Sequence, residues 1–187
     1  MKYRNHASCQ GKISIGSSSV LFCNGIENMP FEAMHQGGKN SLILDGDGTV
    51  GRHSDARVDT SAIEALNQAR EQGHITNVAY VSNNPDKDLA DIRAKQLGIT
   101  PELTLTPDTL RHRKPGQYMI RLALKRLDAD PTSVVGVGDG LTDLHAYYTA
   151  GLDSVHVHKF GHQEARGYVG RPTIRRFVLG ALHKALI

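Results

Sequence analysis

The sequence has little that points to an exported or membrane-spanning protein. Its only cysteines are Cys9 and Cys23, too few and too widely spaced to complete a tetrahedral metal site by themselves. No apolar region of the signal-peptide type follows Met1, and no run approaches the roughly 18 apolar residues that a transmembrane helix needs. We therefore expect a cytoplasmic protein with two free thiols in a reducing compartment, and a disulfide is the alternative.

Internal repeats and low-complexity linkers are also missing. The chain has 187 residues, 39% of them hydrophobic and 22% charged, which is the composition of one ordinary globular domain with a core of its own. The net charge of +3 is unevenly placed, because residues 159–187 carry +5 and the remainder carries −2. The basic excess near the end of the chain suggests an anionic partner.

The stretch that organises the rest of the chain is residues 41–50, Ser-Leu-Ile-Leu-Asp-Gly-Asp-Gly-Thr-Val. A short apolar run that ends in two aspartates and two glycines predicts a buried parallel strand whose carboxyl end opens at a binding site. On an extended chain Asp45 and Asp47 would point in opposite directions, so both reach one bound group only if the backbone turns. Gly46 and Gly48 permit that turn.

Elements of alternating type follow this strand. We expect further strands at 77–81, 102–105, 134–137 and 154–158, and helices from 59 or 60 to 73, from 86 to 98 with Leu89, Ile92 and Leu97 inward, from 115 to 127 and from 144 to 150. This alternation predicts right-handed βαβ units and a three-layer, Rossmann-like α/β domain with a parallel sheet over residues 41–187. The connections are too short for a cap domain.

Residues 1–40 form an N-terminal extension whose pattern is hard to interpret. Residues 12–15 and 20–23 could pair as a hairpin, and residues 30–36 could form one short helix that ends at the following glycines.

The polar loops after the strands converge on one edge of the predicted sheet. They carry six candidate site residues: Asp45, Asp47, Ser82, Lys114, Asp139 and Asp143. Carboxylates are hard oxygen ligands that suit Mg²⁺, while a lysine and a hydroxyl can neutralise phosphate oxygens. The pattern therefore predicts a site for Mg²⁺ and a phosphoryl group.

Four short motifs occur in order at these positions. They are Leu-Ile-Leu-Asp-Gly-Asp-Gly-Thr at 42–49, Val-Ser-Asn at 81–83, Lys-Pro at 114–115, and Val-Gly-Asp through Thr-Asp at 137–143. Over about residues 40–158 they resemble the haloacid dehalogenase superfamily of phosphatases. The form of the last motif and the missing cap are similar to the capless subclass IIIA, which includes bacterial phosphatidylglycerophosphate phosphatases. Those lipid phosphatases usually have an asparagine where this chain reads Gly-Asp-Gly.

The resemblance implies a Mg²⁺-dependent phosphatase that forms an aspartyl-phosphate intermediate. Asp45 would be the nucleophile, and Asp47 would be the general acid and then the general base, a task that needs a raised pKa. Asp45, the main-chain carbonyl of Asp47 and Asp139 would hold the metal. Asp143 would either contact the metal through water or anchor the lysine. The phosphate oxygens would be held by Ser82, Asn83 and Lys114.

A different class of function stays open, because a fold does not dictate an activity. The alternative is a non-catalytic phosphate-binding or scaffold protein, although such a protein would have no use for the second aspartate of the Asp45 and Asp47 pair. For an enzyme, lipid, nucleic-acid and small-metabolite phosphates are all possible substrates. Residues 173–187 form a basic amphipathic pattern, which predicts a helix that packs on the sheet or on a second copy in a homo-oligomer, or that binds an anionic membrane surface or nucleic acid.

Two further groups of residues could take part in binding. His156, His158 and His162 have a spacing that could hold zinc, but no fourth ligand accompanies them, and histidines that face a helix layer or solvent are the simpler interpretation. Residues that adjoin the predicted site could select the substrate or only raise its positive potential: Arg52, His53, His112 and Arg113.

Overall fold

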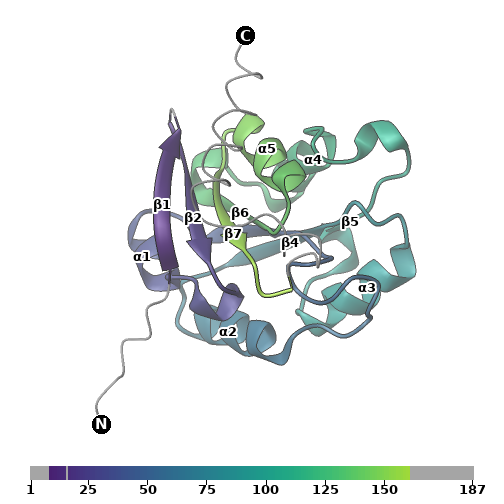
Figure 1. Ribbon diagram of the computed structural model, residues 1–187. Coiled ribbons are helices and arrows are strands. Elements are labelled where there is room, and N and C mark those ends of the chain that lie inside the picture. The colour runs from purple at the N-terminus through teal and green to yellow at the C-terminus, as the bar shows by residue number, and fades with distance from the viewer. Residues whose placement is uncertain (1–8, 16, 161–187) are drawn as a thin grey trace, which may run out of the picture.

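The computed structural model describes residues 9–15 and 17–160 (Figure 1). The strands are β1 Cys9–Ile15, β2 Ser18–Cys23, β3 Ser41–Leu44, β4 Asn77–Val81, β5 Thr104–Leu105, β6 Val134–Gly138 and β7 Asp153–Val157. The helices are α1 Phe31–Gln36, α2 Thr60–Glu71, α3 Lys87–Gln96, α4 Tyr118–Leu127 and α5 Leu141–Thr149. Four single 3₁₀ turns complete the set: η1 Ile26–Asn28, η2 Pro101–Leu103, η3 Leu110–His112 and η4 Pro131–Ser133.

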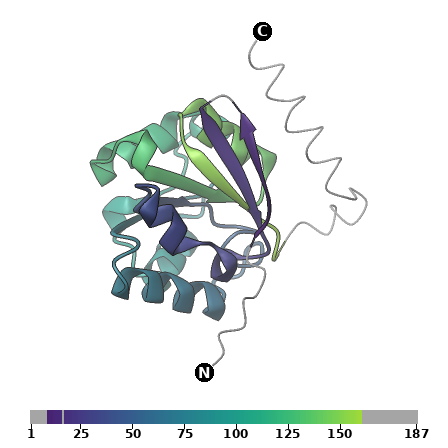
Figure 2. The same cartoon turned by 90° about the vertical axis from the view of Figure 1, so that its left-hand side faces the viewer.

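The described strands form one seven-stranded sheet in the order β1-β2-β7-β6-β3-β4-β5. The five strands that the alternating pattern predicts are parallel, β2 joins them as a sixth, and only β1 runs antiparallel to its neighbour. The predicted hairpin is confirmed, and it belongs to this sheet: β2 pairs with β7, so that Val20 lies opposite Ser154. Figure 2 shows the hairpin beside β7 at one edge of the molecule.

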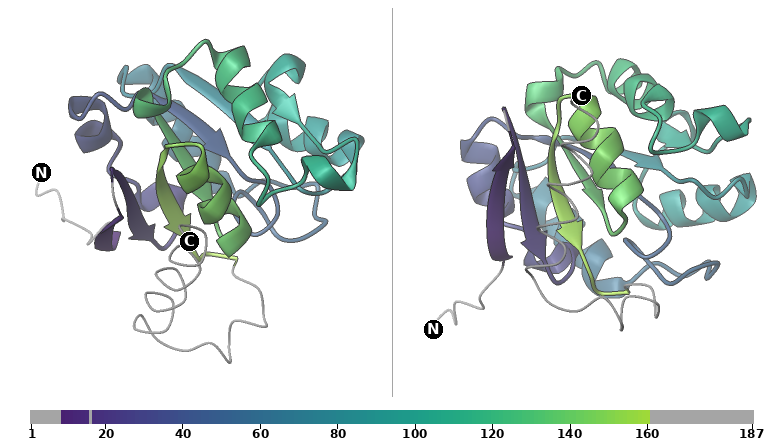
Figure 3. Two further views of the ribbon diagram at one scale, coloured as in Figure 1. Left: turned by 90° about the horizontal axis from the view of Figure 1, so that it is seen from above. Right: turned by 45° about the horizontal axis from the view of Figure 1, so that its top comes forward.

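Helices cover both faces of the sheet, which confirms the three-layer architecture (Figures 1 and 3). Side chains alternate along β3, so Leu42 and Leu44 belong to the same apolar cluster as Leu66 of α2. Ile43 points to the opposite face and belongs to the cluster that contains Ile120 of α4. All three β3 side chains are fully buried, as expected for a strand covered on both faces.

Several element boundaries differ from the prediction. The helix expected at 115–127 begins only at Tyr118, and Pro115 precedes it in a cis peptide bond with Lys114. The strand expected at 102–105 is limited to Thr104–Leu105, because Pro101 opens a 3₁₀ turn over the residues before it. Both of these differences lie next to a proline, whose fixed φ and missing N–H favour turns over regular elements. The helix expected at 144–150 also differs, because it begins at Leu141.

The buried face of α3 was predicted only in part, since Leu97 is buried as expected. Ile92 was expected inward but is 49% exposed, whereas Arg93 is fully buried. The two other buried residues of this helix are Ala90 and Ala94. Ala90 and Ala94 are small, so the helix can lie close to the molecule, and the Arg93 guanidinium donates to the main-chain carbonyls of Asp55 and Arg52.

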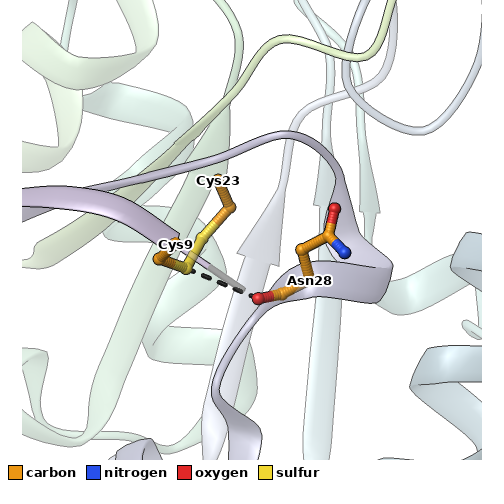
Figure 4. Close-up of a disulfide and its surroundings, with 3 residues drawn as sticks. All are labelled: Cys9, Cys23 and Asn28. Carbon is orange, nitrogen blue, oxygen red and sulfur yellow. Dashed lines mark hydrogen bonds between the residues drawn. A yellow bond between two sulfur atoms is a disulfide. The ribbon is translucent and has the colours of Figure 1, made fainter. Parts of the chain in front are cut away.

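Cys9 and Cys23 form a disulfide, so the expectation of free thiols was wrong (Figure 4). The two residues lie opposite each other in the β1–β2 pair, with their Cα atoms 4.4 Å apart, and that separation falls within the range that a disulfide can bridge. The Cys9 sulfur also lies 3.4 Å from the carbonyl oxygen of Asn28. A disulfide sulfur carries no hydrogen, so this is a contact without a donated proton.

Some predictions fall on residues that the structure does not describe. The basic helix expected at 173–187 and the third histidine, His162, both lie outside the described residues. Within residues 9–15 and 17–160, no helix is both long and apolar enough to cross a bilayer.

Candidate functional site

The candidate site lies where the carboxyl ends of β3, β4 and β6 meet. Asp45 directly follows β3, Ser82 follows β4 and Asp139 follows β6. A pocket opens at this edge, and the following residues line it: Asp45, Asp47, His53, Ser54, Ser82, Asn83, Asn84, Pro85, Arg113, Asp139, Gly140, Thr142 and Asp143. The sequence-based expectation that these loops converge agrees with this arrangement.

Three aspartates form a carboxylate cluster at the pocket, made of Asp45, Asp139 and Asp143. Each offers an oxygen atom, and these atoms all lie within 4.8 Å of one another. The ammonium of Lys114 lies beneath the cluster, 2.5 Å from Asp45 Oδ1 and 2.6 Å from Asp143 Oδ1. Its Nζ also donates to the carbonyl of Val81 at 2.9 Å. The lysine side chain is fully buried, so this pairing forms in a medium of low polarity.

The pKa values in the cluster reflect an excess of negative charge. Burial raises the pKa of Asp45 to about 7, with a further rise from Asp143 and a smaller opposing effect of Lys114. Burial, again with Asp143, raises the pKa of Asp139 to about 6. Burial alone would lower the pKa of Lys114, but the charges of Asp143 and Asp45 outweigh it and the net pKa is raised. Both partners of the ion pair thus shift upward, because one ammonium faces three carboxylates.

The cluster therefore fits a divalent cation. Its donors are carboxylate oxygens, the ligands that Mg²⁺ prefers, and a cation would supply the positive charge that Lys114 alone does not. Among the residues that the structure describes, this is the one group of three or more potential metal-ligating side chains that lie close together.

Two glycines give the loop after β3 its shape. Gly48 has φ +82°, and a Cβ atom there would lie 2.1 Å from Asp139 Oδ2. A Cβ atom on Gly46 would lie 2.1 Å from the hydroxyl of Tyr80. The predicted turn is thus present, and close approach of neighbouring side chains is a second reason for these glycines. The hydroxyl of Thr49 donates to Asp45 Oδ2 at 3.1 Å, which fixes the other end of that carboxylate.

The carboxylate of Asp47 lies outside the cluster and has its own set of donors. Its Oδ1 accepts hydrogen bonds from Arg93 Nη1 at 2.7 Å and from the N–H of Ser54 at 3.0 Å. Its Oδ2 accepts one from Asn84 Nδ2 at 3.1 Å and faces His53 Nδ1 at 3.6 Å. The metal contact expected from the main-chain carbonyl of Asp47 stays a prediction.

The pKa of Asp47 was expected to be raised, and that expectation was wrong. Burial raises the pKa of this carboxyl, but the hydrogen bonds from Arg93, Ser54 and Asn84 outweigh it and the net pKa is lowered. Hydrogen bonds donated to a carboxylate stabilise its charged form. In this structure Asp47 is therefore held ionised at neutral pH.

The residues expected to bind phosphate are positioned in different ways. Ser82 lines the pocket, and its Oγ accepts the N–H of Asn84 at 3.1 Å. The Asn83 amide instead bonds the main chain of Lys114 at both ends, donating to its carbonyl at 2.9 Å and accepting from its N–H at 2.7 Å. Asn83 therefore fixes the loop that carries the lysine.

Asp143 had two possible roles, and the structure shows the anchoring one. Its Oδ1 pairs with Lys114, and its Oδ2 accepts the N–H of Gly140 at 2.9 Å at the start of α5. This contact also satisfies one of the free N–H groups at the start of that helix.

The remaining candidates divide between the pocket and other parts of the molecule. His53 and Arg113 line the pocket, whereas Arg52 and His112 do not. His112 stacks on Tyr118 with 3.7 Å between ring centroids. On β7 and just after it, the Nδ1 atoms of the neighbouring histidines, His156 and His158, lie 3.0 Å apart.

Sequence reasoning missed Arg93, Asn84 and Thr49 as parts of the site. Thr49 lies within the motif at 42–49 but was given no role of its own, and Asn84 lies one residue beyond the motif at 81–83. Arg93 lies 46 residues from Asp47 on a helix whose apolar residues suggested another buried face. No local signal marks this arginine as a site residue.

Comparisons with known proteins place these features in context. Residues 36–151 match the haloacid dehalogenase-like hydrolase family. The chain is 29% identical over 96 residues to the pyrophosphatase PpaX of Bacillus velezensis, and the match covers 50% of this chain and 43% of that protein. The chain thus matches less than half the length of this curated relative.

Two solved structures illustrate the similarity in fold. NagD from E. coli K-12 has a TM-score of 0.51 at 16% identity, covering 68% of this chain and 91% of that one. A HAD family hydrolase from Deinococcus radiodurans R1, solved with bound phosphate and sodium, has a TM-score of 0.52 at 16% identity, covering 72% and 90%. At such identities the likeness supports the fold alone.

Proposed function

This chain belongs to the haloacid dehalogenase-like hydrolase family, and from that premise we propose that it is a Mg²⁺-dependent phosphatase that acts through an aspartyl-phosphate. The observation that carries the proposal is the buried Asp45 carboxylate, held by Lys114 and Thr49 beside two further carboxylates at an open pocket. A nucleophilic carboxylate fixed at both oxygens is what covalent phosphoryl transfer needs.

The proposed reaction has two displacements. In the first, a carboxylate oxygen of Asp45 forms a bond to phosphorus while the bond from phosphorus to the leaving oxygen breaks, and Asp47 gives that oxygen a proton. In the second, water attacks the same phosphorus, Asp47 takes a proton from the water, and the Asp45 carboxylate is released. When bound by Asp45 and Asp139, a divalent cation supplies positive charge that reduces repulsion between the carboxylate and the phosphate.

Residues around Asp45 can stabilise the phosphate in this scheme. The Ser82 hydroxyl lines the pocket and can donate to a phosphate oxygen. The ammonium of Lys114 stabilises negative charge from beneath. Arg113 and His53 line the pocket as well, so they can contact parts of the substrate beyond the reacting phosphate.

The open pocket bears on the type of substrate. The connections from β3 to α2 and from β4 to α3 are short loops without inserted domains, and this supports assignment to a capless subclass. We therefore propose a substrate large enough to cover the site itself, such as a lipid or nucleic-acid phosphate. The pyrophosphatase relative adds inorganic pyrophosphate as a substrate to test.

A phosphatase assay with purified protein tests the proposal. Phosphomonoesters of several classes and pyrophosphate would be tried with Mg²⁺ and with EDTA, and turnover is expected only with the metal. Asp45→Asn should abolish both turnover and labelling of the protein by phosphate. Asp91→Asn, at an exposed carboxylate on α3, is the matched control and should be as active as the wild type. EDTA-resistant turnover would contradict the metal requirement, and phosphate binding without turnover would favour a non-catalytic protein.

The basic residues 159–187 support a second proposal, which rests on sequence alone. We propose that they bring the site to an anionic lipid surface. The protein should co-sediment with anionic liposomes at low salt. A gel shift with nucleic acid under the same conditions shows whether it binds nucleic acid as well. If the protein binds neither liposomes nor nucleic acid, residues 159–187 have a structural role instead.

A further inference from the structure

Arg93 directs its guanidinium at main-chain and hydroxyl oxygens as well as at a carboxylate. The side chain is fully buried, and its guanidinium donates to four oxygens. Nη1 reaches Asp47 Oδ1 at 2.7 Å and the Tyr80 hydroxyl at 3.4 Å. Nε and Nη2 reach the carbonyls of Asp55 and Arg52 at 2.7 and 2.6 Å. Only one of these four oxygens carries a full charge, so the residue does more than neutralise Asp47.

The two carbonyl contacts fix the loop that completes the surroundings of Asp47. Residues 52–55 are held at both ends by Arg93, and Ser54 lies between them. Ser54 has φ +54°, an unfavourable backbone conformation for a residue with a side chain, and its N–H donates to Asp47 Oδ1 at 3.0 Å. Arg93 thus positions Asp47 both directly and through this loop.

The two carboxylate oxygens of Asp47 consequently differ in the number of hydrogen bonds that they accept. Oδ1 accepts two hydrogen bonds, from Arg93 and from Ser54, which together occupy the two acceptor positions of one carboxylate oxygen. Oδ2 accepts one, from Asn84, and faces His53 Nδ1 at 3.6 Å. Because Asp47 lines the pocket, Oδ2 is the oxygen with room for a proton.

We propose that Arg93 is the positioning residue for proton transfer: it anchors Asp47 by Oδ1 so that Oδ2 meets the leaving oxygen of the substrate. The inference rests on the proposed function, in which Asp47 protonates the leaving group. Asp47 is ionised in this structure, so Oδ2 first takes up a proton from solvent. The Oδ2–H bond then breaks as the leaving oxygen gains this proton and its bond to phosphorus breaks. In the second displacement Oδ2 takes a proton from the attacking water, which restores the protonated carboxyl.

Substrates that differ in their need for a proton test this role. A 4-nitrophenyl ester leaves readily as an anion, whereas an alkyl phosphate such as glycerol phosphate needs protonation. The measured quantity is kcat/KM, which reports the steps up to release of the leaving group and excludes hydrolysis of the aspartyl-phosphate. Arg93→Met should lower kcat/KM for the alkyl ester at least about tenfold more than for the nitrophenyl ester. Arg93→Lys, which keeps one charged donor, should show a smaller difference.

Gln96 offers a matched control on the same helix. Its side chain holds the same loop, since Nε2 donates to the carbonyl of Ala56 at 2.7 Å and Oε1 accepts the N–H of Val58 at 3.1 Å, but no hydrogen bond joins it to Asp47. Gln96→Ala should therefore affect both substrates equally. In a protein that already carries Asp47→Asn, adding Arg93→Lys should not change the ratio of kcat/KM between the two substrates, because the proton donor is already absent.

The possible outcomes separate this inference from the proposed function. A wild-type protein without activity on either ester, on lipid and nucleic-acid phosphates or on pyrophosphate would overturn the proposed function. An active wild type whose Arg93 variants lose kcat/KM equally on both esters, as Gln96→Ala is expected to do, would overturn the positioning role alone. If Arg93→Met does not fold, the Arg93→Lys comparison in the two backgrounds decides the same question.

Discussion

Replacing Lys114 by methionine should destabilise the fold strongly. The ammonium lies 2.5 Å from Asp45 Oδ1 and 2.6 Å from Asp143 Oδ1 and is fully buried. Removing it leaves two buried carboxylates without their shared counter-charge. Breaking a buried ion pair by removing one partner costs about 3–5 kcal/mol, which is a large part of the stability of a typical domain. Urea unfolding of both proteins in EDTA, followed by circular dichroism, measures the difference.

An exposed ion pair supplies the control for this experiment. Lys87 pairs with Asp91 one turn further along α3, and their side chains are 47% and 43% exposed. Lys87→Met should cost no more than about 0.5 kcal/mol. If Lys114→Met costs as little as Lys87→Met, the buried pair contributes nothing to stability and the reasoning is refuted.

The cost of Lys114→Met should also depend on pH. The pKa of Asp45 is raised from 3.8 to about 7 by burial and by Asp143, against the effect of Lys114. A carboxyl with a raised pKa contributes stability at low pH that is lost as the pH rises through its folded-state pKa. Without Lys114 the pKa of Asp45 rises further, so above pH 7 the variant loses more of its free energy of unfolding than the wild type does. The difference between the two proteins should be larger at pH 8 than at pH 5.

Three further predictions concern glycine, the disulfide and the core. Gly48→Ala should destabilise the protein more than Gly38→Ala. The two glycines have similar φ angles, +82° and +79°, but only a Cβ atom on Gly48 would clash with a neighbouring side chain. Because that neighbour is Asp139, Gly48→Ala should also weaken the thermal stabilisation by Mg²⁺. An equal loss in urea unfolding would contradict this. Reduction of the disulfide at Cys9 should lower the free energy of unfolding by about 3 kcal/mol, and an unchanged urea midpoint in dithiothreitol would count against it. Leu66→Ala should cost about 2–5 kcal/mol and Ile92→Ala under about 1, because these side chains are 0% and 49% exposed. Similar losses in thermal unfolding would show this burial pattern to be wrong.

The central part of the site could be predicted because its signals are local. The apolar run at 41–44 is followed directly by Asp45, and the structure forms β3 over those four residues. Asp139 likewise follows the apolar strand β6. Carboxyl ends of parallel strands meet at one edge of a sheet, so the position of each aspartate next to its strand was enough to bring the two together.

The features that were missed depend on contacts between distant residues. Arg93 is buried because the carbonyls of Arg52 and Asp55, about 40 residues earlier, accept its hydrogen bonds. Nothing near position 93 encodes those acceptors, and Ile92 beside it carries the stronger apolar signal. The disulfide depends in the same way on the register of β1 against β2, which places Cys9 opposite Cys23.

The pairing of β2 with β7 sets the order in which the chain can fold during synthesis. The N–H of Ser19 donates to the carboxylate of Asp153 at 2.6 Å, and 134 residues separate the two. A ribosome that adds about 5–20 residues per second needs on the order of 10 s to make that length of chain. The pairing of β1 with β2 is local and can form early. During all of that time the other edge of β2 has no strand to pair with. Until β7 emerges, β2 is the surface that a chaperone would need to cover.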